Sequence, residues 1–170
     1  MLIDSFLPEG VTTLTVDSIF MMPQLGVLAA VHEEAATQVF ERDCLIYLGD
    51  CVAPVGKHKP GRLMMSVKHP GGTLEVKAGE MTVLPRERDE GPLEVTIQPG
   101  PTLNIGNGPG KPWTGKLNGG TVGIIFDGRG RRPFAYKNAV SELSESERLS
   151  ALSRWNQALE LYPDFYKENS

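Results

Sequence analysis

The sequence predicts an α+β fold with a small β-barrel or β-sandwich at its centre, an N-terminal α/β segment and a C-terminal amphipathic helix. Three observations support this prediction. Short apolar or alternating runs recur through the middle of the chain between turn residues, 19 glycines and 13 prolines indicate many turns, and apolar residues recur at helical spacing near the C-terminus. At 170 residues the chain has ordinary single-domain size.

Residues 1–43 are expected to form the α/β segment. Thr13–Val16 is a candidate strand, and His32–Arg42 contains good helix formers, with His32 placed to cap the helix start. The residues expected on the buried face of this helix are Val31, Ala35, Val39 and Phe40. Met1–Phe6 resembles the end of a helix stopped at Pro8, which predicts a fragment or a subunit that docks onto a larger protein.

Residues 44–137 form the predicted β-rich domain. Its candidate strands are Cys44–Leu48, Arg62–Val67, Thr73–Val76, Met81–Leu84, Leu93–Ile97, Val122–Phe126 and Phe134–Tyr136. Pro70–Gly72 predicts a hairpin connection, because glycine tolerates the positive φ of tight turns. Pro99–Gly120 is rich in glycine and lacks a periodic pattern, so a long surface loop is expected there.

Residues 138–170 are predicted to be one helix and a tail. Ser144–Glu147 fits a capping box, in which each side chain accepts from the other residue's backbone N–H. The expected apolar face contains Leu149, Leu152, Trp155 and Leu159, and the helix should end before Pro163. The aromatic tail beyond it fits either a packed end or a partner surface.

Composition excludes several classes of function. The net charge of −4 disfavours broad attachment to nucleic acid or to an anionic membrane, since both depend on clustered positive charge. No apolar run approaches the roughly 20 residues needed to span a bilayer, and no signal peptide pattern begins the chain. With only two cysteines, a disulfide framework is not expected, and we predict a cytoplasmic protein.

No catalytic or metal-binding motif stands out. Cys44, Cys51 and His58 are spaced seven residues apart, but structural zinc sites usually place paired ligands two to four residues apart and need four ligands. We therefore expect no metal site and interpret the cysteines as small apolar side chains, with Cys44 buried and Cys51 partly buried. The chain has neither a nucleophile-elbow motif nor a zincin motif.

The glycine-rich segment Gly106–Lys111 offers one candidate binding site. It superficially resembles a Walker loop, but only three residues separate its first glycine from Gly-Lys, and Pro112 stands in place of the hydroxyl residue. Two alternatives remain for this segment, a plain loop or an anion-binding nest of backbone N–H groups. The nest would be built from Gly106, Gly108, Gly110 and Lys111.

The second candidate is a basic hairpin at the end of an apolar strand. After Gly123–Asp127 the chain continues through a glycine-rich turn that carries Arg129, Arg131 and Arg132. Arginines presented on such a turn can bind carboxylate or phosphate with two hydrogen bonds. A solvated tip without function is the alternative. If the hairpin binds a partner, Arg129→Ala with Arg131→Ala should weaken that binding and leave the melting temperature nearly unchanged.

Five segments spread over residues 10–135 carry motifs that occur together in a known family. They are Val16–Leu28, Glu33–Ala36, Asp43–Gly49, Ala53–Gly56 and Gly123–Arg131. Together they resemble the C-terminal part of the glutamate mutase accessory protein family, called MutL in the glutamate mutase operon and distinct from the mismatch-repair protein. In that family a larger preceding part looks like an actin-like ATPase, and the proteins are associated with adenosylcobalamin-dependent mutases.

The resemblance implies an appended β domain preceded by a remnant of the ATPase fold's last α/β unit. The phosphate-binding segments of an actin-like ATPase would lie upstream, and none occurs in this sequence, so no nucleotide-site residue carries over. The isolated chain is therefore expected to have no catalytic activity and no cofactor of its own. ATP or adenosylcobalamin would be bound by a partner.

The preferred function is a non-catalytic accessory or interaction subunit whose partner is an actin-like ATPase or a cobalamin-dependent mutase. Its expected contact surface combines the basic hairpin with the Pro99–Gly120 loop. One alternative is a small subunit of an enzyme complex, which completes an active site or binds a phosphate-bearing ligand through the glycine loop. Another is a homo-oligomerisation unit that uses Trp155 and the aromatic tail.

Overall fold

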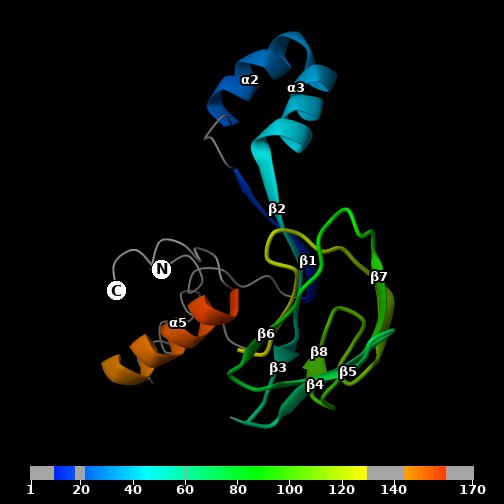
Figure 1. Cartoon of the computed structure of the whole chain (residues 1–170), viewed down its shortest axis with the longest axis vertical. Coiled ribbons are helices and arrows are strands. Elements are labelled where there is room, and N and C mark those ends of the chain that lie inside the picture. The colour runs from blue at the N-terminus through cyan, green and yellow to red at the C-terminus, as the bar shows by residue number, and fades with distance from the viewer. Residues whose placement is uncertain (1–9, 18–21, 60, 130–143, 160–170) are drawn as a thin grey trace.

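The computed structural model describes residues 10–17, 22–59, 61–129 and 144–159. These residues form a strand-rich α+β structure with three α-helices and three separate sheets, which confirms the predicted class. None of the described sheets closes into a barrel, so the barrel alternative of the prediction is wrong. Figure 1 shows a strand-rich body, a helical projection at one end and one helix beside the body.

The first sheet has four strands in the order β1-β2-β10-β6. These strands are β1 (Gly10–Asp17), β2 (Leu45–Ala53), β10 (Ile124–Asp127) and β6 (Met81–Leu84). The pair β2 and β10 is parallel, and the other two pairs are antiparallel. All four residues of β10 are buried, as expected for a central strand whose two faces are both covered.

The second sheet has the order β5-β4-β7-β9 and is antiparallel throughout. Its strands are β5 (Gly72–Lys77), β4 (Leu63–His69), β7 (Leu93–Pro99) and β9 (Trp113–Leu117). His69 pairs with Gly72, which confirms the hairpin predicted from Pro70 to Gly72. Gly72 has a φ of 135°, a conformation open to glycine at little cost.

Part of the predicted 99–120 loop is ordered strand instead. It contains β9 and the short β8 (Leu103–Asn104), which pairs with β3 (Val55–Gly56) as a separate two-stranded sheet. The prediction failed because the central residues of β9, Thr114 to Lys116, show no apolar alternation. Pairing with β7 and the complete burial of Leu117 hold this strand in place.

Both four-stranded sheets contribute side chains to one core. The fully buried members include large residues from β2, β4, β7, β9 and β10, which pack in a single cluster. The cluster comprises Val52, Met65, Val67, Val76, Val95, Ile97, Ile105, Leu117, Ile124 and Phe126. The shared burial of these side chains joins the two sheets into one body, because apolar burial is the main favourable contribution to folding.

A helical hairpin is inserted between β1 and β2. It consists of α2 (Met22–Val31), α3 (Glu33–Val39) and the π-helical turn η1 (Phe40–Cys44). Together with the outer ends of β1 and β2, residues 15–17 and 45–47, we call this unit the arm. In Figure 1 the arm projects from the body, with α2 and α3 side by side beyond the β1–β2 ribbon.

The sequence missed α2 and assigned Val31 to the buried face of the next helix, α3. The other residues expected on that face are half-buried, namely Ala35, Val39 and Phe40. His32 is non-helical and its ring nitrogen accepts from the Ala35 N–H at 3.2 Å, which confirms the predicted cap. Val31 therefore belongs to the preceding helix, where it is 84% exposed, and the buried residue of α3 is Ala36. The error arose because the cap separates two helices that a single periodic pattern had merged.

The C-terminal helix α5 (Glu145–Leu159) begins as predicted. The Glu147 carboxylate accepts from the Ser144 hydroxyl at 2.6 Å and from its backbone N–H at 2.9 Å, and these bonds lower the pKa of Glu147. Leu149 is exposed, whereas Trp155 is half-buried against the body. The expectations for residues 1–6, 134–136 and the tail from 160 onward lie outside the described residues.

Candidate functional site

The first predicted site residue, Arg129, lies inside the protein and not at an exposed hairpin tip. It directly follows β10, and only 8% of its surface is exposed. The buried Asp127 carboxylate accepts from the Arg129 Nε at 3.0 Å and from its terminal guanidinium nitrogen at 2.6 Å. The Arg129 backbone N–H also donates to Asp127, at 2.9 Å. Arg131 and Arg132 lie outside the described residues.

The Arg129 guanidinium also connects the body to α5. Its central carbon lies 4.8 Å from the ring centre of Trp155, a cation–π distance. The indole N–H of Trp155 donates to the carbonyl of Gly79 at 3.2 Å, just before β6. Arg129 therefore completes a structural contact between β10 and the C-terminal helix. Such a buried, paired guanidinium is not presented to an external anion.

The glycine loop does not present open N–H groups for an anion. The side-chain oxygen of Asn104 accepts from the N–H groups of both Gly106 and Gly108 at 2.8 Å. The Gly110 N–H donates to the Leu103 carbonyl at 2.8 Å, and the Lys111 N–H to the Gly108 carbonyl at 3.3 Å. All four N–H groups of the proposed nest are thus engaged internally. This geometry favours the plain-loop alternative.

The three residues of the weak metal hypothesis do not come together. Cys44 and Cys51 are both reduced thiols; Cys44 is buried, as predicted, and Cys51 is more deeply buried than expected. His58 lies on an open groove described below. Within the described ranges no three His, Cys, Asp or Glu side chains are grouped as metal ligands. Cys51 packs with Leu14 and Ile125, which is the behaviour of a small apolar side chain.

Burial raises the pKa of both thiols above the ordinary value of 9.0, and nearby carboxylates add to the effect, chiefly Asp127 for Cys51 and Asp17 for Cys44. We expect Cys51 of the folded protein to resist an aromatic disulfide reagent at mildly alkaline pH, because the thiolate is the reactive form. Above pH 9.0 the unfolded thiol ionises while the folded one stays neutral, so stability should fall as pH rises.

Urea unfolding at a series of alkaline pH values, with and without Cys51→Ala, checks this expectation. The variant should start less stable and lose less stability with rising pH. If the unfolding free energy falls equally steeply with pH in both proteins and the native thiol is labelled fast, then Cys51 ionises normally in the folded protein.

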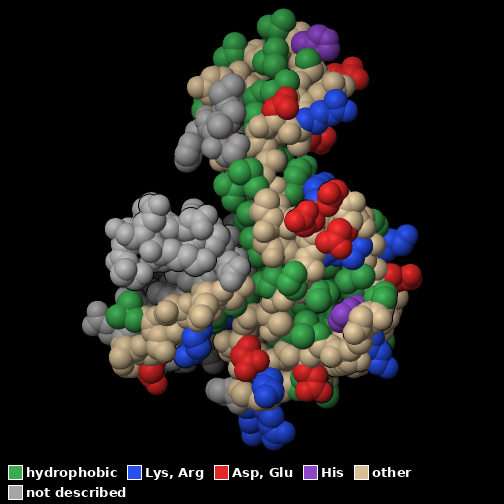
Figure 2. Space-filling model, viewed as in Figure 1, with side chains coloured by type: hydrophobic (Ala, Val, Ile, Leu, Met, Phe, Trp, Pro, Cys, Tyr) green, Lys and Arg blue, Asp and Glu red, His purple; other side chains and the backbone are tan. Residues whose placement is uncertain are grey.

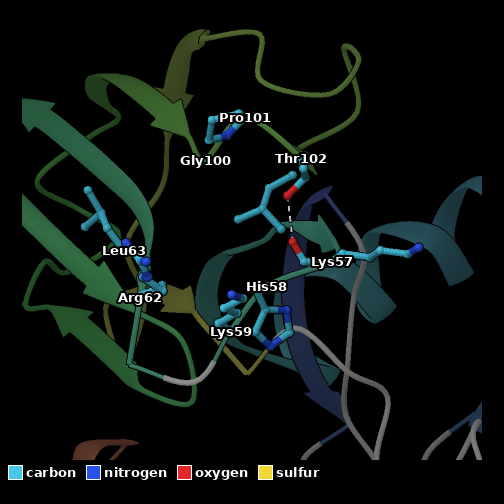
Figure 3. Close-up of a pocket in the computed structure, with 9 residues that line it drawn as sticks. Lys57, His58, Lys59, Arg62, Leu63, Gly100, Pro101 and Thr102 are labelled. Atoms are coloured by element: carbon cyan, nitrogen blue, oxygen red, sulfur yellow. Dashed lines mark hydrogen bonds between the residues drawn. The ribbon is translucent and has the colours of Figure 1, made fainter.

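A basic groove lies where β3, β4 and the turn before β8 meet. It is an open depression with a volume of about 600 Å³, which is in the range of small-molecule sites. Figure 3 shows Arg62 and Leu63 on one side, Lys57 on the other with its side chain extending away from Arg62, and His58 and Lys59 between them. The wall opposite His58 and Lys59 is formed by Gly100, Pro101, Thr102 and Leu103. Sequence reasoning missed this groove.

Backbone contacts hold the rims of the groove. The Thr102 hydroxyl donates to the Lys57 carbonyl at 2.6 Å, a bond drawn in Figure 3. Gly56 has a φ of 151°, and a Cβ there would lie 2.3 Å from the Thr102 carbonyl oxygen. Only glycine allows the two segments to approach this closely. In the sequence, the groove could have been found from the basic residues between positions 57 and 62, which directly follow a Pro-Val-Gly segment.

The arm is a second surface that sequence reasoning did not single out. Eight large apolar residues are exposed among the described residues, and five of them belong to the arm: Val16, Val27, Leu28, Val31 and Ile46. Val16 and Ile46 are directly paired across the ribbon, so their side chains share one face. Figure 2 shows apolar side chains at the surface of the arm, interspersed with charged groups.

Comparisons with known proteins leave the family unidentified. No family model, no curated protein and no solved structure matches the chain. Within the part of the chain that the structure describes, no helix is both long and apolar enough to cross a membrane.

Proposed function

We propose that the chain is a non-catalytic accessory domain or subunit that binds a larger protein through the arm. The observation that carries the proposal is the exposure of apolar residues there, with Val27 73% and Val31 84% exposed. Exposed apolar side chains gathered on one projecting unit are typical of interaction sites, because exposing them to water is unfavourable. The body, a β-sandwich in this proposal, is the rigid base from which the arm projects.

The chemistry of α2 defines the kind of partner. The helix carries no charged residue, and only Leu25 among its described side chains is buried, so it offers an apolar face without charge selectivity. Such a helix fits an apolar groove on another protein. The resemblance stated above suggests an actin-like ATPase or a cobalamin-dependent mutase as that protein. ATP or adenosylcobalamin would then be bound by the partner, and we assign no catalytic step to this chain.

Val27→Ser combined with Val31→Ser should abolish partner binding while changing the free energy of unfolding by less than about 1 kcal/mol, because exposed positions contribute little to stability. A photocrosslinking amino acid placed at Leu28 in the native cells should yield one discrete adduct, identified by mass spectrometry. We expect that adduct to contain an actin-like ATPase or a cobalamin-dependent mutase subunit, and to disappear in the double variant.

The matched control is Val55→Ser with Leu149→Ser, which removes two exposed apolar residues outside the arm. Its adduct should be unchanged. An adduct with a second copy of the chain would support homo-oligomerisation instead. Absence of any adduct, or equal loss of the adduct in the control, would overturn the role of the arm.

A further inference from the structure

The basic groove defined above concentrates positive charge in a chain whose net charge is −4. Lys57, Lys59 and Arg62 all line it, together with His58, and none of the nine lining residues is acidic. A concave surface of one charge sign attracts ligands of the opposite sign, since the field is focused there. The groove therefore selects for anions even though the protein as a whole is acidic.

These charges are not neutralised within the described part of the chain. The two ion pairs found there join Arg86 to Glu90 and Arg129 to Asp127, and neither involves a residue of the groove. Lys57, Lys59 and Arg62 are exposed, so their charged groups face solvent. Like charges gathered in one groove repel one another, and a bound anion relieves that repulsion.

Backbone hydrogen bonds hold the described residues at both ends of the basic segment and on the opposite wall. The Lys57 carbonyl accepts from Thr102, and the Arg62 carbonyl accepts from the Ala78 N–H at 2.7 Å. On the opposite wall the Gly100 N–H donates to the Met64 carbonyl at 2.9 Å. A prearranged site loses less entropy on binding, which favours affinity.

The groove also has an apolar wall. Leu63 is 47% exposed, Pro101 is exposed, and Leu103, which also lines the groove, is buried. A simple inorganic anion would leave this wall in water. A ligand that joins an anionic group to an apolar or planar portion would cover both parts of the lining, as is usual for small-molecule sites.

We infer that the groove binds a small phosphate-bearing molecule with an apolar or planar body. Arg62 and Lys59 hold the phosphate groups, and Leu63 and Pro101 contact the body. Phosphate suits the site better than a single carboxylate because Lys59 and Arg62 both line the groove and a guanidinium can bind two phosphate oxygens at once. The inference concerns a site separate from the arm and does not rest on the arm's proposed role.

Amide chemical shifts of the full chain, titrated with pyrophosphate and with ADP at low ionic strength, test the inference. Both probes should give saturable shifts around residues 57–63 and 100–103, and ADP should bind several-fold more tightly. Lys59→Gln with Arg62→Gln should weaken both probes by roughly tenfold or more, since each loses charge-assisted hydrogen bonds. Leu63→Ser should weaken ADP binding to the level of pyrophosphate and leave pyrophosphate binding unchanged.

Lys68→Gln with Lys116→Gln is the matched control, because it removes two exposed positive charges from the second sheet. Its effect should stay below about twofold, as expected for screened, distant charges. Equal weakening by both pairs would reduce the result to bulk electrostatics and overturn the site. Absence of saturable shifts at millimolar ADP would also overturn it, whereas the arm variants should bind ADP normally.

Discussion

Replacing Arg129 with alanine is expected to lower the free energy of unfolding by about 3–5 kcal/mol. The substitution leaves the Asp127 carboxylate buried, at 2% exposure, without its guanidinium partner. It also removes the cation from the face of Trp155, where α5 meets the body. The sequence had suggested an exposed arginine whose loss would be tolerated, so equilibrium urea unfolding separates the two descriptions directly.

Arg88→Ala is the matched control. Its guanidinium also lies over an aromatic ring, at 3.5 Å from the centre of Tyr47, but Arg88 is exposed and makes no ion pair among the described residues. Its loss should cost about 0.5–1 kcal/mol. The double variant Asp127→Ala with Arg129→Ala should be less destabilised than the sum of the single variants. If Arg129→Ala costs no more than Arg88→Ala, the buried pair does not stabilise the fold.

The second large effect is expected at Gly49, where alanine should cost at least about 3 kcal/mol. Its φ is 132°, and a Cβ would lie 1.9 Å from the Gly123 carbonyl oxygen. Gly49 sits at the irregularity of the β1–β2 ladder, where the register shifts after Leu14. The Leu48 carbonyl there accepts from the N–H groups of Val122 and Gly123, at 3.0 and 3.2 Å.

A second glycine isolates the cause of this effect. Gly72 has nearly the same φ, 135°, but nothing lies within 4 Å of its added Cβ. Gly72→Ala therefore carries the conformational cost alone, whereas Gly49→Ala adds a collision with backbone that cannot move aside. Urea unfolding should show a clearly larger loss for Gly49→Ala. Equal losses for the two variants would mean that the 118–123 segment relaxes away from β2 without cost.

Residues near one another in sequence were sufficient to predict much of the body. Seven of the eight expected strands overlap strands of the structure, and the eighth, residues 134–136, lies outside the described residues. Met81–Leu84 has the expected bounds. The Gly72 hairpin and the Ser144 capping box were also correct. Each of these features depends on alternation, a turn residue or a cap within a few positions of the chain, so the local pattern carries the information.

The errors concern features that depend on contacts distant in sequence. Strand β9 exists through its pairing with β7, whose paired residues lie 16 to 24 positions away. Arg129 looked exposed because glycines and arginines surround it, yet the folding of β10 into the middle of a sheet buries its Asp127 partner.

The two candidate surfaces differ from the predicted ones for the same reason. Exposure of the arm follows from the projection of α2 and α3 beyond the body, which no helical period reveals. The groove needs the 57–63 segment and the 100–103 turn side by side, and the β3–β8 pair and the Thr102 hydroxyl bring them together. The sequence alone was therefore sufficient to determine strand and turn types, through interactions between neighbouring residues. Tertiary packing decided burial and the grouping of charges, because both depend on which distant segment covers a side chain.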